Sequence, residues 1–198
     1  MAEAADLVRA QRLAAGPRGD EAPHNLFFAL RPNQETAALI ADLIEALRWR
    51  DGFTGPEVTP ERLHITLNPL GGHPRLPQGV IARACEAVSR VRMRPFVVAL
   101  NRVVSFENAG RRRPLVLLGE DGVIGVHALY SAIHSAVADA GLARRSEPGL
   151  TPHLTLLRDS RAIAEEYIAP IRWQVREFVL IDSRYGESRH EILGRWRL

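Results

Sequence analysis

Two short segments of this sequence share the pattern His, apolar residue, Thr, Leu, and they begin 89 residues apart, at His64 and His153. The same offset lays the apolar segment 26–30 on 115–119, and a segment with helical periodicity follows in both places. One offset that aligns a strand, a helix and a motif in the same order indicates an internal duplication. We therefore expect two halves related by a pseudo-twofold axis, with their motif strands facing each other across a shared cleft.

The chain from residue 24 onward alternates between apolar strands and amphipathic helices. Pro32 closes the first strand, and Asn33 and Glu35 suit the cap and the first turn of the helix that follows. Gly141 suits the end of the corresponding helix in the second half. After each motif we expect a further helix and strand. The expected helices span 33–49, 79–91, 123–141 and 160–168, and the expected strands span 24–31, 62–70, 95–106, 113–119, 152–157, 173–183 and 189–198.

Strand periodicity places the polar residues of each motif on one face. His64 and Thr66 alternate with apolar residues, and so do His153 and Thr155. Because side chains in a strand point alternately to opposite faces, the apolar residues enter the core and the four polar ones remain together outside it. A facing pair of strands would then present two imidazoles and two hydroxyls on an apolar support.

Such a group of side chains is suited to metal-independent hydrolysis of a phosphodiester. An imidazole titrates near neutrality, so one ring of a pair can act as a base while the other acts as an acid, and a bell-shaped pH profile with both limbs near neutrality is expected. The hydroxyls can donate to phosphate oxygens that gain charge during the attack. A zinc site would need more ligands than the neighbouring Thr, Asn and Leu residues offer. We expect neither a metal nor another cofactor.

Composition sets only loose limits on function. With 198 residues, of which 46% are hydrophobic, the chain can bury a substantial core in one compact unit. The net charge of +3 favours a polyanionic partner only weakly, and all 26 basic residues are arginines, a bias we attribute first to base composition. The segment GRRRP at 110–114 fits a solvated turn, although near a cleft it could guide a phosphate backbone.

The remaining features indicate an intracellular protein with a simple organisation. Cys85 is the single cysteine, so an intrachain disulfide cannot form. Residues 1–23 have no signal-peptide core, and no segment reaches the roughly 20 apolar residues that cross a bilayer. We expect a cytoplasmic protein, with no membrane association and no obligate protein partner, in which residues 1–23 form a flexible tail and residues 24–198 form the functional domain.

The two motifs, RLHITLNPLG and TPHLTLLR, together with NLFFAL near the start and EILGRWRL at the end, resemble the two-histidine phosphoesterases. The similarity is greatest to the RNA 2′,3′-cyclic phosphodiesterases, also called 2′-5′ RNA ligases, and it covers residues 24–198. The resemblance implies a bilobed α+β fold, with two antiparallel sheets facing a central cleft and helices on the outside. It implies that His64 and His153 are the catalytic pair, and that Thr66, Thr155 and Arg158 bind the phosphate.

In such an enzyme, His64 would protonate the leaving 3′ oxygen of a terminal RNA 2′,3′-cyclic phosphate, and His153 would activate water to give a 2′-phosphate. Ligation through 2′-5′ linkages would be the reverse reaction. Two alternatives remain: a phosphodiesterase of this fold that acts on small cyclic nucleotides or on 2′-5′ oligonucleotides, and a non-catalytic RNA-binding module.

The sequence departs from the family at one place, because Asn68 and Pro69 follow the first motif where relatives often have an aromatic residue that can stack on a base. Phe53 or Trp49 could take that role, although both also suit a core. Of the other histidines, we expect His127 and His134 to be partly exposed on a helix, and we assign no partner to His24, His73 or His190.

Overall fold

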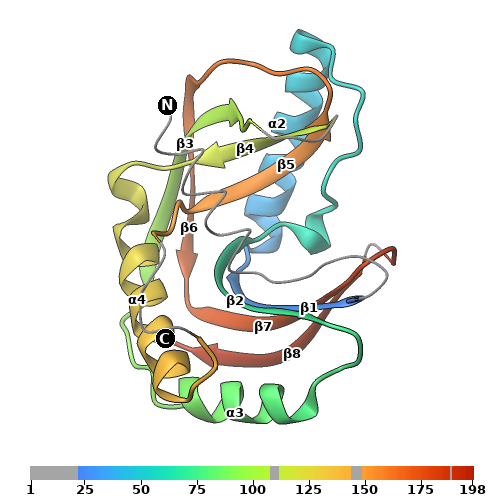
Figure 1. Ribbon diagram of the computed structural model, residues 1–198. Coiled ribbons are helices and arrows are strands. Elements are labelled where there is room, and N and C mark those ends of the chain that lie inside the picture. Colours follow the sequence, from blue (N-terminus) through green and yellow to red (C-terminus); the bar gives the residue numbers. More distant parts are fainter. Residues whose placement is uncertain (1–21, 108–111, 144–148, 188) are drawn as a thin grey trace.

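The computed structural model describes residues 22–107, 112–143, 149–187 and 189–198, and within these residues eight antiparallel strands form one sheet in the order β6-β3-β4-β5-β2-β1-β7-β8 (Figure 1). Residues 1–21 of the expected tail lie outside the described residues. The strands are β1 (His24–Leu30), β2 (Ile65–His73), β3 (Phe96–Ser105), β4 (Arg113–Leu118), β5 (His153–Asp159), β6 (Glu166–Val175), β7 (Glu177–Arg184) and β8 (Arg189–Arg197); the helices are α2 (Gln34–Asp51), α3 (Gln78–Val88) and α4 (Ile124–Asp139), with short 3-10 turns η1 (Pro60–Arg62) and η2 (Asp121–Val123).

The sheet consists of two four-stranded halves that meet at the motif strands. One lobe contains β2, β1, β7 and β8, and the other contains β5, β4, β3 and β6. β2 and β5 share a single registered pair, Ile65 with Leu154. The α+β, two-lobed architecture agrees with the expectation, but this pair joins the two expected sheets into one.

The duplication is visible in the order of the elements and in the register. In each half, a strand precedes a long helix and then the motif strand. Leu30 lies opposite Ile65 in the first lobe, and Leu117 lies opposite Leu154 in the second. Equivalent residues of β1 and β4 are therefore 87 positions apart instead of 89. A shift of two residues preserves which face each side chain occupies.

Each lobe combines strands from both halves of the sequence. β3 follows the first motif in the chain but pairs with β4 and β6 of the second lobe, and β7 returns from the second lobe to pair with β1. The helices pack in a similar crossed way, because α2 contacts β5 and β6 while α4 contacts β2 and β3. Buried side chains of both lobes consequently form one continuous hydrophobic cluster.

Both ends of helix α2 carry residues that favour a helix terminus. Asn33 Oδ1 accepts a hydrogen bond of 2.8 Å from the Thr36 N–H. Gly52 ends the helix with φ +70°, a left-handed conformation that favours glycine, and its N–H donates to Arg48 O. These two termini fix the length of α2 and the start of the segment that leads to the first motif.

One expected helix is wrong. Residues 160–165 form no regular element, and 166–175 form the edge strand β6 in place of the last third of the expected helix. Ile171, Trp173 and Val175 alternate with exposed residues and bury one face of the strand. Pro170 is incompatible with a helix interior but is tolerated in an edge strand, where no partner needs its missing N–H.

None of the helices within the described residues is long and apolar enough to cross a membrane.

Candidate active site

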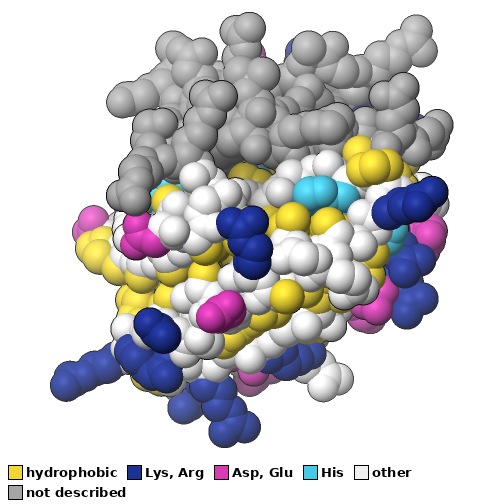
Figure 2. Space-filling model, turned by 60° about the horizontal axis from the view of Figure 1, so that its bottom comes forward, with side chains coloured by type: hydrophobic (Ala, Val, Ile, Leu, Met, Phe, Trp, Pro, Cys, Tyr) yellow, Lys and Arg dark blue, Asp and Glu magenta, His cyan; other side chains and the backbone are white. Residues whose placement is uncertain are grey.

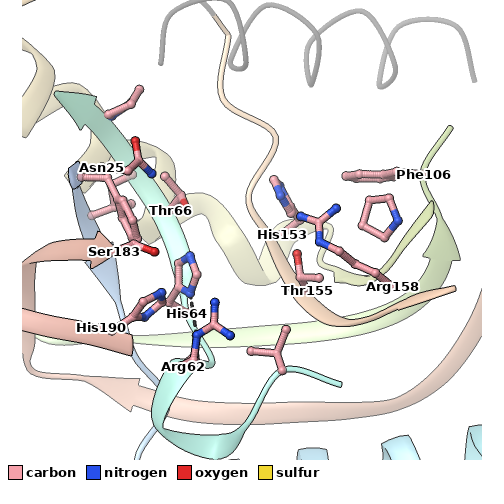
Figure 3. Close-up of a pocket in the computed structure, with 15 residues that line it drawn as sticks. Asn25, Arg62, His64, Thr66, Phe106, His153, Thr155, Arg158, Ser183 and His190 are labelled. Atoms are coloured by element: carbon pink, nitrogen blue, oxygen red, sulfur yellow. Dashed lines mark hydrogen bonds between the residues drawn. The ribbon is translucent and has the colours of Figure 1, made fainter. Parts of the chain in front are cut away.

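A cleft of about 280 Å³ opens between the two motif strands and is lined by residues of both lobes (Figure 3). All five residues that the sequence singles out border this cleft: His64, Thr66, His153, Thr155 and Arg158. The two histidines lie on opposite walls, each with the threonine of its own strand beside it. Their catalytic and binding roles stay predictions. The other lining residues are Asn25, Phe27, Val58, Arg62, Leu67, Pro69, Phe106, Pro114, Ser183 and His190.

Both motif histidines are oriented in the same way. His64 Nδ1 lies 2.7 Å from the carbonyl oxygen of Arg62, and His153 Nδ1 lies 2.8 Å from the carbonyl oxygen of Thr151. A carbonyl only accepts, so Nδ1 carries the hydrogen in each ring and donates it to the residue two positions earlier. The neutral ring then presents Nε2 as its acceptor, which is the atom needed for proton transfer.

A β-bulge brings Arg158 to the cleft. Arg158 is five residues after His153, so a regular strand would place it on the opposite face. In the pairing of β5 with β4, however, Leu115 opposite Leu157 is followed by Val116 opposite Thr155, and one extra residue is inserted in β5. This insertion reverses the alternation, so Arg158 faces the cleft together with His153 and Thr155.

β2 contains the same kind of bulge at the equivalent place. Ala29 pairs with Thr66, whereas Phe27 pairs with Pro69, so three steps along β2 match two along β1. Pro69 therefore occupies, in the first lobe, the position that Arg158 occupies in the second. Only the second lobe carries a cation at this position.

An aromatic ring supports each imidazole. Phe27 stacks on His64 with ring centroids 5.1 Å apart, and Phe106 contacts His153 edge-on at 5.3 Å. Each phenylalanine ring packs against its imidazole and restricts the orientation of that imidazole. Neither phenylalanine was identified from the sequence as part of the site, because Phe27 belongs to an ordinary apolar run and Phe106 lies outside both motifs.

His64 is neutral in the unliganded protein at neutral pH. Burial lowers its pKa to about 4, and the positive charges of Arg62, Arg31 and a protonated His153 act in the same direction, against the hydrogen bond to Arg62 O. The expectation that both limbs of the pH profile lie near neutrality therefore changes for the free protein. A negative charge bound in the cleft opposes this shift, because it stabilises the imidazolium.

A third histidine, His190 of β8, borders the cleft in the first lobe. Its ring lies 5.0 Å from that of His64 and 5.8 Å from that of Phe27. Burial, followed by the charges of His64, Arg62 and Arg31, lowers its pKa to about 3. No local pattern in the sequence points to this residue, because it lies outside the EILGRWRL segment and β8 is distant in the chain from β2.

Other candidates from the sequence lie elsewhere. Phe53 is a core residue, and Trp49 is 90% exposed on α2, so neither borders the cleft. Asn68 is buried and also does not border it. His127 is exposed as expected, but the expectation for His134 is wrong, because α4 turns this side chain into the protein, where it contacts Tyr130.

The segment before β2 is attached to β5 through a buried carboxylate. Asp159 accepts hydrogen bonds from the backbone N–H groups of Thr54, Gly55 and Arg161. Burial alone would raise the pKa of Asp159, but these bonds together hold it at about 2. Gly55 is required here, because a Cβ atom would lie 2.0 Å from Arg158 O. The carboxylate thus connects the segment at residues 54–55 to the backbone that directly follows Arg158.

Arginines are distributed over the surface. On the face shown in Figure 2, arginine side chains project at separate points with acidic side chains between them. Of the segment 110–114, residues 110 and 111 lie outside the described residues, Arg112 and Arg113 are exposed, and Pro114 borders the cleft. The cleft, more than a continuous basic face, is the distinctive feature of the described surface.

A two-lobed fold in which two His-x-Thr strands face one cleft is the arrangement of the two-histidine phosphoesterases. Residues 32–187 match the family model described as the 2′-5′ RNA ligase superfamily, and the chain belongs to this superfamily. Its members are phosphoesterases and RNA-processing enzymes that act on RNA or nucleotides.

Solved structures agree with this assignment. The structure of E. coli LigT in complex with 3′-AMP superposes with a TM-score of 0.69 at 27% sequence identity, covering 89% of this chain and 98% of that chain. The structure of apo E. coli LigT superposes with a TM-score of 0.68, at the same sequence identity and coverage. The Thermus thermophilus protein TT0787 shares the fold, with a TM-score of 0.69 at 22% identity over 88% of this chain and 97% of that one. No curated protein matches the sequence significantly.

Proposed function

We propose that this protein is a metal-independent phosphodiesterase that opens RNA 2′,3′-cyclic phosphate ends to 2′-phosphates, with His64 and His153 as acid and base. The observation that carries the proposal is the placement of two equally oriented imidazoles on opposite walls of one cleft, each with a hydroxyl beside it. E. coli LigT, which was crystallised with 3′-AMP, supports a nucleotide as the substrate class.

The proposed reaction is an in-line displacement at phosphorus. His153 Nε2 removes a proton from water, and the water oxygen forms a bond to phosphorus. The bond from phosphorus to the 3′ oxygen breaks, and His64 Nε2 gives its proton to that oxygen. The 2′ ester bond is retained, so the product is a 2′-phosphate. Return of one proton from His153 through solvent to His64 restores the starting state.

Thr66, Thr155 and Arg158 are proposed to bind the non-bridging phosphate oxygens. The two hydroxyls approach from the two walls, and Arg158 adds a planar donor next to His153. Donors aimed at oxygens that gain charge lower the energy of the transition state more than that of the ground state. In this proposal Arg158, whose counterpart in the first lobe is Pro69, donates to the phosphate on the side of the attacking water.

The lowered pKa of His64 couples its protonation to substrate binding. The free protein holds His64 neutral, whereas the acid role needs an imidazolium. The phosphodiester brings one negative charge into the cleft, and this charge raises the pKa of a neighbouring imidazole. His64 therefore takes up its proton together with the substrate, and the acid is formed only where a phosphate is bound.

The decisive experiment measures turnover of an oligonucleotide that ends in a 2′,3′-cyclic phosphate, in the presence of a chelator. The wild type should form the 2′-phosphate, and the His64→Ala/His153→Ala double variant should not. No turnover, with the oligonucleotide still bound, would favour the RNA-binding module. Turnover of mononucleoside cyclic phosphates or of 2′-5′ oligonucleotides alone would favour the other phosphodiesterase activities.

A further inference from the structure

A row of three polar residues crosses the first lobe next to His64. Asn25 of β1 lies directly opposite Ser183 of β7, and Ser183 lies directly opposite His190 of β8. All three border the cleft, and they lie on the same wall as His64 (Figure 3). Residues in register across adjacent strands have neighbouring Cβ atoms, so the three side chains form one continuous polar strip.

Two atoms of this strip lack a protein partner within the described residues. Asn25 Oδ1 and His190 Nδ1 are both buried without a hydrogen bond. A buried polar atom without a partner costs free energy, and such atoms are rare unless a ligand or water satisfies them. Both belong to residues that border the cleft.

The strip is uncharged, and a row of largely buried apolar side chains adjoins it. With its pKa lowered to about 3, His190 is neutral at neutral pH, and Asn25 and Ser183 carry no charge. The next row on the same face consists of Phe27, Ile181 and Ile192. Neutral donors and acceptors beside apolar side chains suit a planar, uncharged, hydrogen-bonding ligand better than they suit a phosphate. Of the two arginines that border the cleft, Arg158 lies on the opposite wall, whereas Arg62 lies near His64 and His190 (Figure 3).

The position of the strip relative to His64 indicates which part of a nucleotide it meets. The His190 and His64 rings are 5.0 Å apart. In the proposed reaction His64 contacts the 3′ oxygen, so the ribose lies on the wall of the first lobe. The base is attached to the carbon next to the one that carries the 2′ oxygen. A base that projects from the ribose along this wall would meet the strip.

We propose that Asn25, Ser183 and His190 form the subsite that binds the edge of the terminal nucleobase. This inference rests on the proposed function, since it depends on His64 contacting the ribose oxygen. It assigns the base to the β1-β7-β8 surface of the first lobe, and not to the position after the first motif, where Asn68 is buried and Pro69 follows. The subsite makes the protein select a nucleotide over a bare ribose phosphate.

The test compares kcat/KM for the four nucleoside 2′,3′-cyclic phosphates with that for methyl riboside 2′,3′-cyclic phosphate, which has no base. The wild type should prefer at least one nucleotide by about tenfold or more. Asn25→Ala and His190→Phe should each lower that preference by about 3- to 10-fold, the scale of one neutral hydrogen bond. His190→Phe retains an aromatic ring against His64 and Phe27. A change confined to proton transfer would alter kcat/KM equally for substrates with and without a base, so it would leave the preference unchanged.

Asn101→Ala is the matched control. Asn101 also has a buried Oδ1 without a partner among the described residues, but it lies on β3 and does not border the cleft. The preference for a nucleotide should be unchanged in this variant. Circular dichroism checks the folding of each protein, and Asn25→Ser replaces Asn25→Ala if the latter does not fold.

The outcomes separate this inference from the proposed function. Equal turnover of nucleotides and methyl riboside by the wild type would overturn the base subsite and leave the phosphodiesterase in place. If no substrate is turned over, the proposed function fails. The base subsite is then tested by comparing calorimetric Kd values for nucleoside 2′-monophosphates and for methyl riboside 2′-phosphate. Equal Kd values, or an unchanged preference in Asn25→Ala and His190→Phe, would overturn it.

Discussion

The two lobes orient their histidines with the same devices but surround them with different side chains. Each motif histidine donates Nδ1–H to the carbonyl two residues earlier, and each is followed by a one-residue bulge. After the bulge, the first lobe has Pro69 and the second has Arg158. The first lobe adds His190 beside its motif histidine, whereas the second presents the apolar cluster of Phe106, Val116 and Leu118.

This contrast indicates which parts of a duplicated site are free to diverge. Each imidazole is oriented by a backbone carbonyl, and the bulge is a feature of the backbone, so neither requires the surrounding side chains to be alike. In the proposed reaction, the lobe with Arg158 activates water and binds phosphate, and the lobe with His190 receives the leaving ribose. In this proposal, two copies of one motif with the same backbone geometry have different roles, because the side chains around them differ.

The largest expected effect concerns what the lobes share. His64→Ala and His153→Ala should each lower kcat by about 10²- to 10⁴-fold, the range of general acid or base catalysis, without unfolding the protein. Steady-state kinetics on a cyclic-phosphate-ended oligonucleotide measures this loss. His73→Ala serves as the control, because His73 does not border the cleft. Near wild-type turnover in either folded cleft variant would exclude the two-histidine mechanism.

The next effect distinguishes the phosphate donors of the two lobes. Thr66→Val and Thr155→Val keep the β-branched shape of the strand residues but delete the hydroxyl, and each should lower kcat by about 10²- to 10³-fold. Arg158→Lys keeps the charge but loses the planar fork, so kcat/KM should fall as well. If both threonine variants keep wild-type kinetics, the hydroxyls stabilise only the local backbone and the phosphate is bound elsewhere.

Asp159 provides a test of the attachment between β5 of the second lobe and the segment that leads to β2 of the first. Asp159→Asn puts an amide donor against the N–H groups of Thr54 and Gly55, and it should lower the free energy of unfolding by about 1–3 kcal/mol. The folded-state pKa of about 2 lies below the usual value, so the stabilisation is complete above about pH 4 and is lost as the pH falls toward 2. Urea unfolding at pH 7 and pH 3 measures both effects. A variant that is as stable as the wild type at pH 7 would contradict this role.

The smallest expected change is in the acid limb of the pH profile. Because kcat/KM reports the free enzyme, its acid limb should lie at about pH 4, the pKa of His64, and kcat/KM should not fall between pH 7 and pH 5. Below about pH 4 His64 no longer provides a neutral imidazole in the free enzyme. The limb in kcat should lie at higher pH, because the bound phosphate raises the pKa of His64. An acid limb of kcat/KM near 6.5 would show that His64 is not shifted.

Much of the site could be predicted because its backbone devices recur in the sequence. The repeated His-x-Thr pattern placed His64, Thr66, His153 and Thr155 on the right faces of their strands, and all four border the cleft. Arg158 was identified from family resemblance, since simple alternation would have placed it on the wrong face. The bulge that corrects this depends on cross-strand register, which a single sequence does not reveal.

The residues of the first lobe's wall could not have been found in this way. Asn25, Ser183 and His190 are far apart in the chain and follow no common pattern. They meet because β7 crosses back from the second lobe and pairs with β1, and because β8 then pairs with β7. The sequence also suggested a helix at 160–168. The last residues of this segment instead belong to β6, which pairs with β3 at the sheet edge.

The sequence by itself determined the duplication, the motif strands and the chemistry of the residues that face the cleft, because periodicity and residue type are local properties of the chain. Only the tertiary structure decided how the lobes exchange strands, which of the other histidines reaches the site, and how far burial shifts the pKa of His64. These properties depend on long-range pairing and on desolvation. Both arise only when distant segments are brought together, and neither is encoded in any one segment.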